Sequence, residues 1–212
     1  IVTKKSLENA AVIVAASGGS TNAALHLPAI ANEAGIKFTL EDVTNISKKT
    51  PYIADLKPGG KYVAKDLYEI GGVPVLIKAL LDGGFLHEDC MTVSGKTIGE
   101  NHKNIVFPSD QKVIYTTSKP LSSRGGFVGL KGNLAPQGAI VKVAGLKRRK
   151  FKGKAKCFDG EPSALKAVLE KKIKPGDVII IRYEGPKGSP GMPEMLSTTG
   201  AIYGQGLGEE VA

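Results

Sequence analysis

Glycine is the residue that most constrains what this chain can fold into. It occupies 27 of the 212 positions, nearly twice the average share of roughly 7%. Glycine weakens the interior of helices and strands and supplies backbone conformations that other residues avoid. The glycines therefore predict short helices and strands joined by tight turns. Hydrophobic residues make up 42% of the chain, which is ordinary for a globular protein and excludes a collagen-like or disordered chain.

The part of the chain before about residue 115 is typical of short helices in an α/β protein. Apolar residues at helical spacing follow the small residues 17–22 and end before Gly35, and Pro28 inside this pattern predicts a kink or a late helix start. Thr39 and Asp42 have the spacing of a capping box, which predicts a helix directly after Thr39. Further helices are predicted over residues 63–70 and 74–83.

Beyond about residue 116 the pattern changes from helices to strands. The turn-rich residues 118–126 are the best candidate for a domain boundary, so we expect one domain over residues 1–118 and another over 119–212. A helix with proline in its first turn is expected over residues 161–171, and a last helix from near Pro193. Strand-like runs occur at residues 127–130, 139–144 and 177–183. Strands around one or two helices predict a small β-barrel-like or β-sandwich domain.

The sequence contains no sign of a membrane segment or a targeting signal. No run approaches the roughly 18 consecutive apolar residues of a membrane-spanning helix, and no signal-peptide pattern follows the first residue, Ile1. Because the chain starts without methionine and ends without a capping or tail signal, we expect it to be a fragment of a longer protein.

The two cysteines do not suggest a metal site. Cys90 and Cys157 lie far apart in the sequence. His87, three residues before Cys90, is the one histidine or cysteine at a suitable spacing, and a lone pair does not make a site. We therefore expect two reduced thiols in a cytoplasmic protein.

The positive charge of the chain is concentrated in one stretch. Eight basic residues and no acidic one lie between positions 142 and 156, and without them the formal net charge falls from +9 to +1. They are Lys142, Lys147, Arg148, Arg149, Lys150, Lys152, Lys154 and Lys156. Such a stretch could bind nucleic-acid phosphates, or it could be a solvated loop between two strands. Phe151 is its one aromatic residue and no recognition helix or zinc-finger spacing accompanies it, so the solvated loop is favoured and no nucleic-acid partner is expected.

Two glycine-containing loops are candidates for ligand binding. Residues 185–194 join the clearest strand to a predicted helix, a junction that offers backbone N–H groups to an anion. Glu194, in the first turn of that helix, either complements the helix dipole or supplies a carboxylate to a hard cation such as Mg²⁺. Residues 17–22, with His26 one turn further on, match neither the Gly-x-Gly-x-x-Gly nor the Walker pattern. A tight loop leading into a helix is the favoured interpretation there, with His26 a packed or capped histidine.

Five blocks of sequence together resemble the dihydroxy-acid dehydratase family. The blocks are residues 18–27, 51–62, 92–97, 132–142 and 181–196. They occur in the family's order and cover nearly the whole chain. The family also includes phosphogluconate dehydratase and sugar-acid dehydratases. The stretch 141–159 is most similar to the member that acts in branched-chain amino-acid synthesis, and Pro28 stands where the family usually has an aliphatic residue.

This resemblance implies a chemistry. Members of the family remove water from a 2,3-dihydroxy carboxylate and form a 2-keto acid through an enol. An iron–sulfur cluster, here expected to be 2Fe–2S, acts as Lewis acid on the departing 3-hydroxyl, Mg²⁺ holds the substrate carboxylate and 2-hydroxyl, and a serine alkoxide removes the C2 proton. Metal charge at both ends of the reacting bond stabilises the transition state.

The resemblance also implies a substrate and a setting. The substrate would be 2,3-dihydroxyisovalerate, converted to 2-ketoisovalerate in valine and isoleucine biosynthesis by a cytoplasmic homodimer. A sugar-acid or phosphogluconate dehydratase is the alternative within the family, and a basic nucleic-acid-binding module is the non-enzyme alternative.

Only one functional residue of the family matches a position of this chain. Glu194 corresponds to the Mg²⁺-binding glutamate, whereas the resemblance places the cluster cysteines, and the aspartate and carbamylated lysine of the Mg²⁺ site, before residue 1. It places the serine shortly after Ala212. The chain by itself is therefore expected to be inactive and to bind no iron. Residues 1–118 would be the C-terminal part of a three-layer α/β domain, and residues 119–212 most of a smaller, swivelling β-barrel-like domain that presents Glu194 to the cluster-bearing domain.

Overall fold

The computed structural model of the chain describes residues 1–146, 148–185 and 194–212. The chain divides into two compact units, Ile1–Leu146 and Lys147–Ala212. Both combine helices and strands, as expected for the α/β class. The strands of the described residues form two separate two-stranded sheets. A barrel requires every strand to be paired on both sides, so these strands form no closed barrel. The boundary after residue 118 concerns the domains of a complete protein and stays a prediction.

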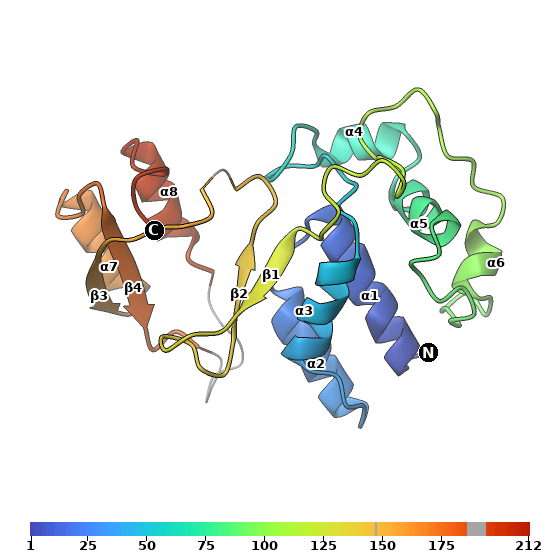
Figure 1. The fold of residues 1–212 in the computed structure, drawn as a ribbon, viewed down its shortest axis with the longest axis horizontal. Helices are drawn as coiled ribbons and strands as arrows, with labels where there is room; N and C mark the ends of the chain where they lie inside the picture. The colour runs from blue at the N-terminus through green and yellow to red at the C-terminus, as the bar shows by residue number, and fades with distance from the viewer. Residues whose placement is uncertain (147, 186–193) are drawn as a thin grey trace. The chain divides into compact units, whose positions relative to one another are not determined.

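Three helices pack on one another in the first unit. They are α1 (Lys4–Ser17), α2 (Ala23–Glu33) and α3 (Leu40–Lys49), which lie side by side in Figure 1. Ala11, Ala15 and Ala16 of α1 are completely buried, and such small side chains allow neighbouring helices to approach closely. Larger buried residues, including Phe38 and Val43, fill the space beside them.

The predicted starts of α2 and α3 have different outcomes. Pro28 lies inside α2, but the helix begins at Ala23, so the expected late start is wrong. The N–H groups of Ala23 and Ala24 already bond to the carbonyls of the preceding turn, at 3.2 and 3.0 Å, which starts the helix before the proline is reached. The capping box of α3 is confirmed, because Thr39 Oγ1 accepts the Asp42 N–H at 3.4 Å and Asp42 accepts the Thr39 N–H at 2.8 Å. Burial alone would raise the pKa of Asp42, but the hydrogen bonds from Thr39 outweigh it and lower that pKa.

The rest of the first unit surrounds a second core. It contains α4 (Ala64–Glu69), α5 (Val73–Asp82) and α6 (Ile98–His102). The helices predicted over residues 63–70 and 74–83 are α4 and α5, and Pro74 stands in the first turn of α5 as expected. The extended segment after α3 runs through this core, where Ile53 and Ala54 are completely buried beside Leu80.

The last turn of α1 holds two other segments by hydrogen bonds. The helix ends at Gly18, whose φ of +62° is left-handed. The carbonyl of Ala15 accepts the Gly126 N–H at 2.9 Å, and the carbonyl of Ala16 accepts the Ile53 N–H at 2.9 Å. A Cβ atom on Gly126 would lie 2.6 Å from the Cα of Gly18. Glycine is therefore required where these backbones meet.

A β-hairpin packs against α3. Its strands are β1 (Phe127–Leu130) and β2 (Ala139–Lys142), which pair antiparallel with Phe127 opposite Lys142. Ser47 of α3 donates a 2.6 Å hydrogen bond to the Phe127 carbonyl. Both strands were predicted, although β2 is shorter than the run of residues 139–144.

The second unit is built on a parallel pair of strands. These are β3 (Lys154–Asp159) and β4 (Asp177–Arg182), connected through α7 (Glu161–Leu169), which packs on them (Figure 1). Helix α8 (Leu196–Gly204) packs on α7 and begins slightly after the predicted position near Pro193. The predictions of β4 and α7 are confirmed. The prediction of a solvated loop over residues 147–156 is wrong in its last part, because Lys154 and Lys156 lie in β3.

Gly126→Ala tests the close approach at the end of α1. We expect this change to lower the free energy of unfolding of the chain by about 2 kcal/mol, because the added methyl group meets the backbone of Gly18. The matched control is Gly132→Ala, since no atom lies within 4 Å of a Cβ at that position. Urea unfolding of the two variants gives the comparison, and equal midpoints would contradict the packing described above.

Candidate metal-ligand site beside the parallel strands

The carboxyl ends of the two parallel strands lie together in the second unit. Asp159 and Arg182 are paired in register there, and their side chains form an ion pair of 2.6 Å. The N–H of Gly160 donates to the Arg182 carbonyl at 3.1 Å. In parallel α/β structures, ligands bind just outside the carboxyl ends of the strands. This end of the sheet is therefore where a functional site is expected.

Three glutamates belong to the segments that leave this end of the sheet. Glu161 opens α7 and Glu184 follows β4, and both are partly buried. Glu194, the residue singled out in the sequence, is exposed and directly precedes Met195, the N-cap residue of α8. Sequence reasoning missed the other two, and the signal that could have found them is a glutamate at each strand–helix junction.

Hydrogen bonds connect these junctions. Glu184 Oε1 accepts the backbone N–H of Glu161 at 2.7 Å. Glu161 Oε1 in turn accepts the backbone N–H of Thr198, in the first turn of α8, at 3.0 Å. The carboxylates of Glu161 and Glu184 therefore hold helix ends together.

A carboxylate such as that of Glu194 suits one position of a Mg²⁺ site. Mg²⁺ prefers oxygen ligands and commonly takes one or two carboxylates while keeping several waters. Among the residues that the structure describes, no three histidine, cysteine or acidic side chains are grouped so that they could hold a metal ion. Glu194 can therefore supply one ligand, and the described part of the chain does not complete a site. The predicted loop 185–194 lies outside the described residues except at its two ends.

The other loop singled out in the sequence, residues 17–22, forms backbone hydrogen bonds with the two helices that it joins. The N–H of Gly19 donates to the Val14 carbonyl of α1 at 2.9 Å, and the carbonyls of Ser20 and Thr21 accept the first N–H groups of α2. These bonds favour the tight loop over a phosphate cradle. His26 is exposed on α2, away from the three glutamates in sequence and in a different unit.

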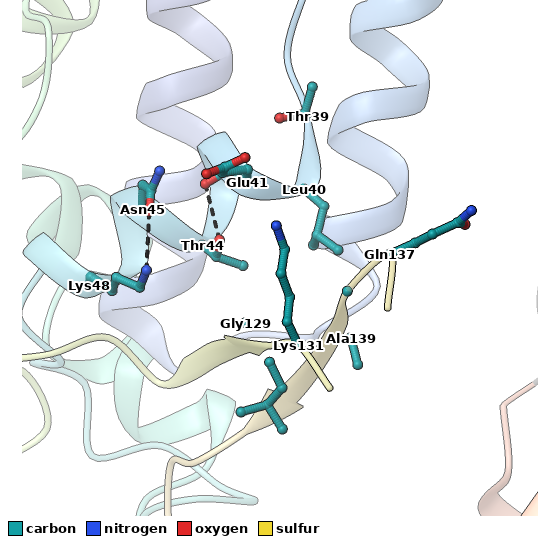
Figure 2. Close-up of a pocket in the computed structure, with 12 residues that line it drawn as sticks. Thr39, Leu40, Glu41, Thr44, Asn45, Lys48, Gly129, Lys131, Gln137 and Ala139 are labelled. Carbon is teal, nitrogen blue, oxygen red and sulfur yellow. Dashed lines mark hydrogen bonds between the residues drawn. The ribbon is translucent and has the colours of Figure 1, made fainter. Parts of the chain in front are cut away.

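A pocket of about 490 Å³ lies between α3 and the β1–β2 hairpin, within the range of roughly 300–1,000 Å³ that is typical of ligand pockets. Figure 2 shows Lys131 extending from the hairpin toward α3. The ionisable residues of the lining are Glu41, Lys48 and Lys131, and Lys48 bonds to Asn45 at 3.2 Å. No histidine, cysteine or pair of carboxylates lines the pocket. It has the size of a binding site and lacks the groups of a catalytic one.

In the described part of the basic stretch, one arginine packs against an aromatic ring. Arg148 stacks over the Phe151 ring at 4.5 Å. Over residues 148–156, its cations form no ion pair with another described residue. No helix of the described ranges is long and apolar enough to cross a membrane.

Comparison with known proteins identifies the family. A model of the N-terminal part of the dihydroxy-acid/6-phosphogluconate dehydratases matches residues 1–101, and a model of the C-terminal part matches residues 112–212. The chain belongs to the dihydroxy-acid/6-phosphogluconate dehydratase family. It is 72% identical over 212 residues to the dihydroxy-acid dehydratase of Pelagibacter ubique (strain HTCC1062), and 63% identical over 212 residues to dihydroxy-acid dehydratase 2 of Bradyrhizobium diazoefficiens. Both alignments cover the whole chain and 37% of the relative, so the chain spans little more than a third of the length of these dehydratases.

Two of the sequence blocks that carry the family resemblance are in contact within the first unit. Gly18, in the first block, lies against Tyr52 of the second, since a Cβ at Gly18 would be 2.8 Å from the Tyr52 ring. The block over residues 132–142 contains β2 and part of the lining of the pocket in Figure 2. Gly18 therefore marks a close contact as well as the end of a helix.

The two cysteines of the chain are unpaired thiols in different units. Cys90 is partly buried and Cys157 is exposed. Burial, and secondarily Asp89, raise the pKa of the Cys90 thiol. Neither cysteine belongs to a group that could hold a metal ion among the described residues.

We expect iodoacetamide at pH 8 to alkylate Cys157 several-fold faster than Cys90. Cys157 is accessible, whereas at Cys90 a raised pKa leaves less of the reactive thiolate and burial limits access. Mass spectrometry of the two cysteine peptides after short reaction times measures both rates. Faster modification of Cys90 would contradict the described environments.

Proposed function

We propose that this chain is part of a dihydroxy-acid dehydratase and that the complete enzyme converts 2,3-dihydroxyisovalerate to 2-ketoisovalerate. The observation that carries the proposal is the 72% identity, over all 212 residues, to a protein named dihydroxy-acid dehydratase. The match of both family models, in order, supports it independently of any one relative. We also propose that the enzyme acts in valine and isoleucine biosynthesis, as a homodimer in the cytoplasm.

Within that enzyme, Glu194 contributes a carboxylate ligand to Mg²⁺. Its exposure, and its place directly before α8, support the assignment. The remaining Mg²⁺ ligands, the iron–sulfur cluster ligands and the serine base are supplied by segments outside this chain. When bound, the cluster and the Mg²⁺ provide the positive charge that a departing hydroxide and an anionic substrate require. Residues 119–212 form most of the smaller, β-barrel-like domain of the complete protein.

A sugar-acid or 6-phosphogluconate dehydratase is the alternative within the same family, since the matching family models cover 6-phosphogluconate dehydratases as well as dihydroxy-acid dehydratases. Formation of 2-keto acid by the full-length gene product separates them. We expect faster turnover of 2,3-dihydroxyisovalerate than of gluconate or 6-phosphogluconate at equal concentrations. The reverse order would assign the protein to the alternative.

Glu194→Gln tests the ligand role in the full-length gene product. The amide keeps the size of the side chain but loses the charge, so we expect the Mg²⁺ concentration for half-maximal turnover to rise at least tenfold. Glu209→Gln is the matched control, because Glu209 is an exposed glutamate of the same unit that follows α8. An unchanged Mg²⁺ dependence of the Glu194 variant, or an equal change in both variants, would overturn the ligand role.

A further inference from the structure

Neither helix that follows a parallel strand has a capping side chain of its own. The N-cap residue of α7 is Gly160 and that of α8 is Met195, and neither makes a side-chain capping hydrogen bond. The first N–H groups of any helix lack partners within the helix. They are usually satisfied by a serine, threonine, aspartate or asparagine at the N-cap. Glycine and methionine cannot do this, so the partners have to come from elsewhere.

In both helices, a glutamate from another segment takes this role. Glu184, beyond the end of β4, accepts the first N–H of α7, and Glu161, in the first turn of α7, accepts an N–H in the first turn of α8. Hydrogen bonds from backbone N–H groups to a carboxylate are charge-assisted and strong. The negative charge also interacts favourably with the positive end of each helix dipole. The two hydrogen bonds therefore connect the end of β4 to α7, and α7 to α8.

This chain of hydrogen bonds extends to Met195, the residue next to Glu194. Thr198, which donates to Glu161, is only 3% exposed, so water cannot readily replace the carboxylate. In the same turn, the N–H and the hydroxyl of Thr199 both donate to the Met195 carbonyl, at 3.2 and 2.7 Å. The position of Met195, and with it the backbone leaving Glu194, is therefore tied to the carboxylate of Glu161.

We propose that Glu161 is a positioning residue for Glu194, and that Glu184 positions Glu161. This inference rests on the proposed role of Glu194 as a Mg²⁺ ligand. Without the bond from Thr198 to Glu161, the first turn of α8 frays, and Glu194 is no longer presented to the metal in one fixed place. Glu161 acts through its hydrogen bond and does not itself contact the metal.

The test measures metal binding directly in the full-length gene product, with Mn²⁺ as the probe and electron paramagnetic resonance as the readout. We expect Glu161→Ala to weaken Mn²⁺ binding about tenfold, the lower end of the range for residues that orient a metal ligand. Glu161→Gln should stay within about twofold of the parent protein, because its amide oxygen can accept the same N–H. Glu161→Asp, whose side chain is one methylene shorter, should weaken Mn²⁺ binding as the alanine variant does. It replaces the alanine variant in the test if that variant does not fold. At saturating Mg²⁺, the turnover number of all three Glu161 variants should return to that of the parent protein.

The matched control is Glu170→Ala, at the opposite end of α7, where the carboxylate pairs with Lys172 on the surface. It should leave Mn²⁺ binding unchanged. Unchanged binding after Glu161→Ala or Glu161→Asp, or equal losses after Glu161→Gln and Glu161→Ala, would overturn the positioning role. If Glu194→Gln binds Mn²⁺ normally, the proposed ligand role itself fails. If Glu194→Gln weakens binding and Glu161→Ala does not, only the positioning role fails.

Discussion

The unpaired backbone groups at helix ends are the constraint on which both units of this chain depend. Each end of a helix leaves N–H or C=O groups without a partner inside the helix, and burying them unpaired is costly. In the first unit, the carbonyls of Ala15 and Ala16 accept N–H groups from two distant segments. In the second, Glu184 and Glu161 accept the N–H groups of α7 and α8. Because each bond joins segments far apart in the sequence, satisfying helix ends also assembles the units.

This constraint explains why glycine is needed at particular positions near helix ends. At the end of α1, Gly18 takes a left-handed conformation, and Gly126 approaches it too closely for any side chain. Gly160 leaves room for Glu184, whose carboxylate oxygen would lie 3.2 Å from a Cβ at that position. Turn formation alone would account for glycine at many positions. Close approach of atoms from another segment accounts for it at these positions.

Local patterns predicted most of the regular elements, because capping boxes, prolines in first turns and β-branched runs act within a few residues. The capping box of Thr39, the strand β4 and the helix α7 follow from such patterns. Strand β3 does not, because alternating lysines over residues 150–156 are equally typical of a solvated loop, and only its pairing with β4 makes a strand. Glu161 and Glu184 were missed for a related reason. Glu184 caps α7 and Glu161 caps α8, and neither helix follows directly after the glutamate that caps it. Glu194 was identified by resemblance to the family, and its surroundings by the structure.

Glu194 is proposed to bind the metal, and Glu161 to act only through Glu194. A double-mutant cycle tests both together, using the Mn²⁺ affinity of the full-length gene product as the measured quantity. In the parent background, Glu161→Ala is expected to weaken binding about tenfold. In the Glu194→Gln background, the same change should weaken it less than about twofold, since the carboxylate that Glu161 positions is gone. A second tenfold loss in that background would show that the two residues act independently and would contradict the account.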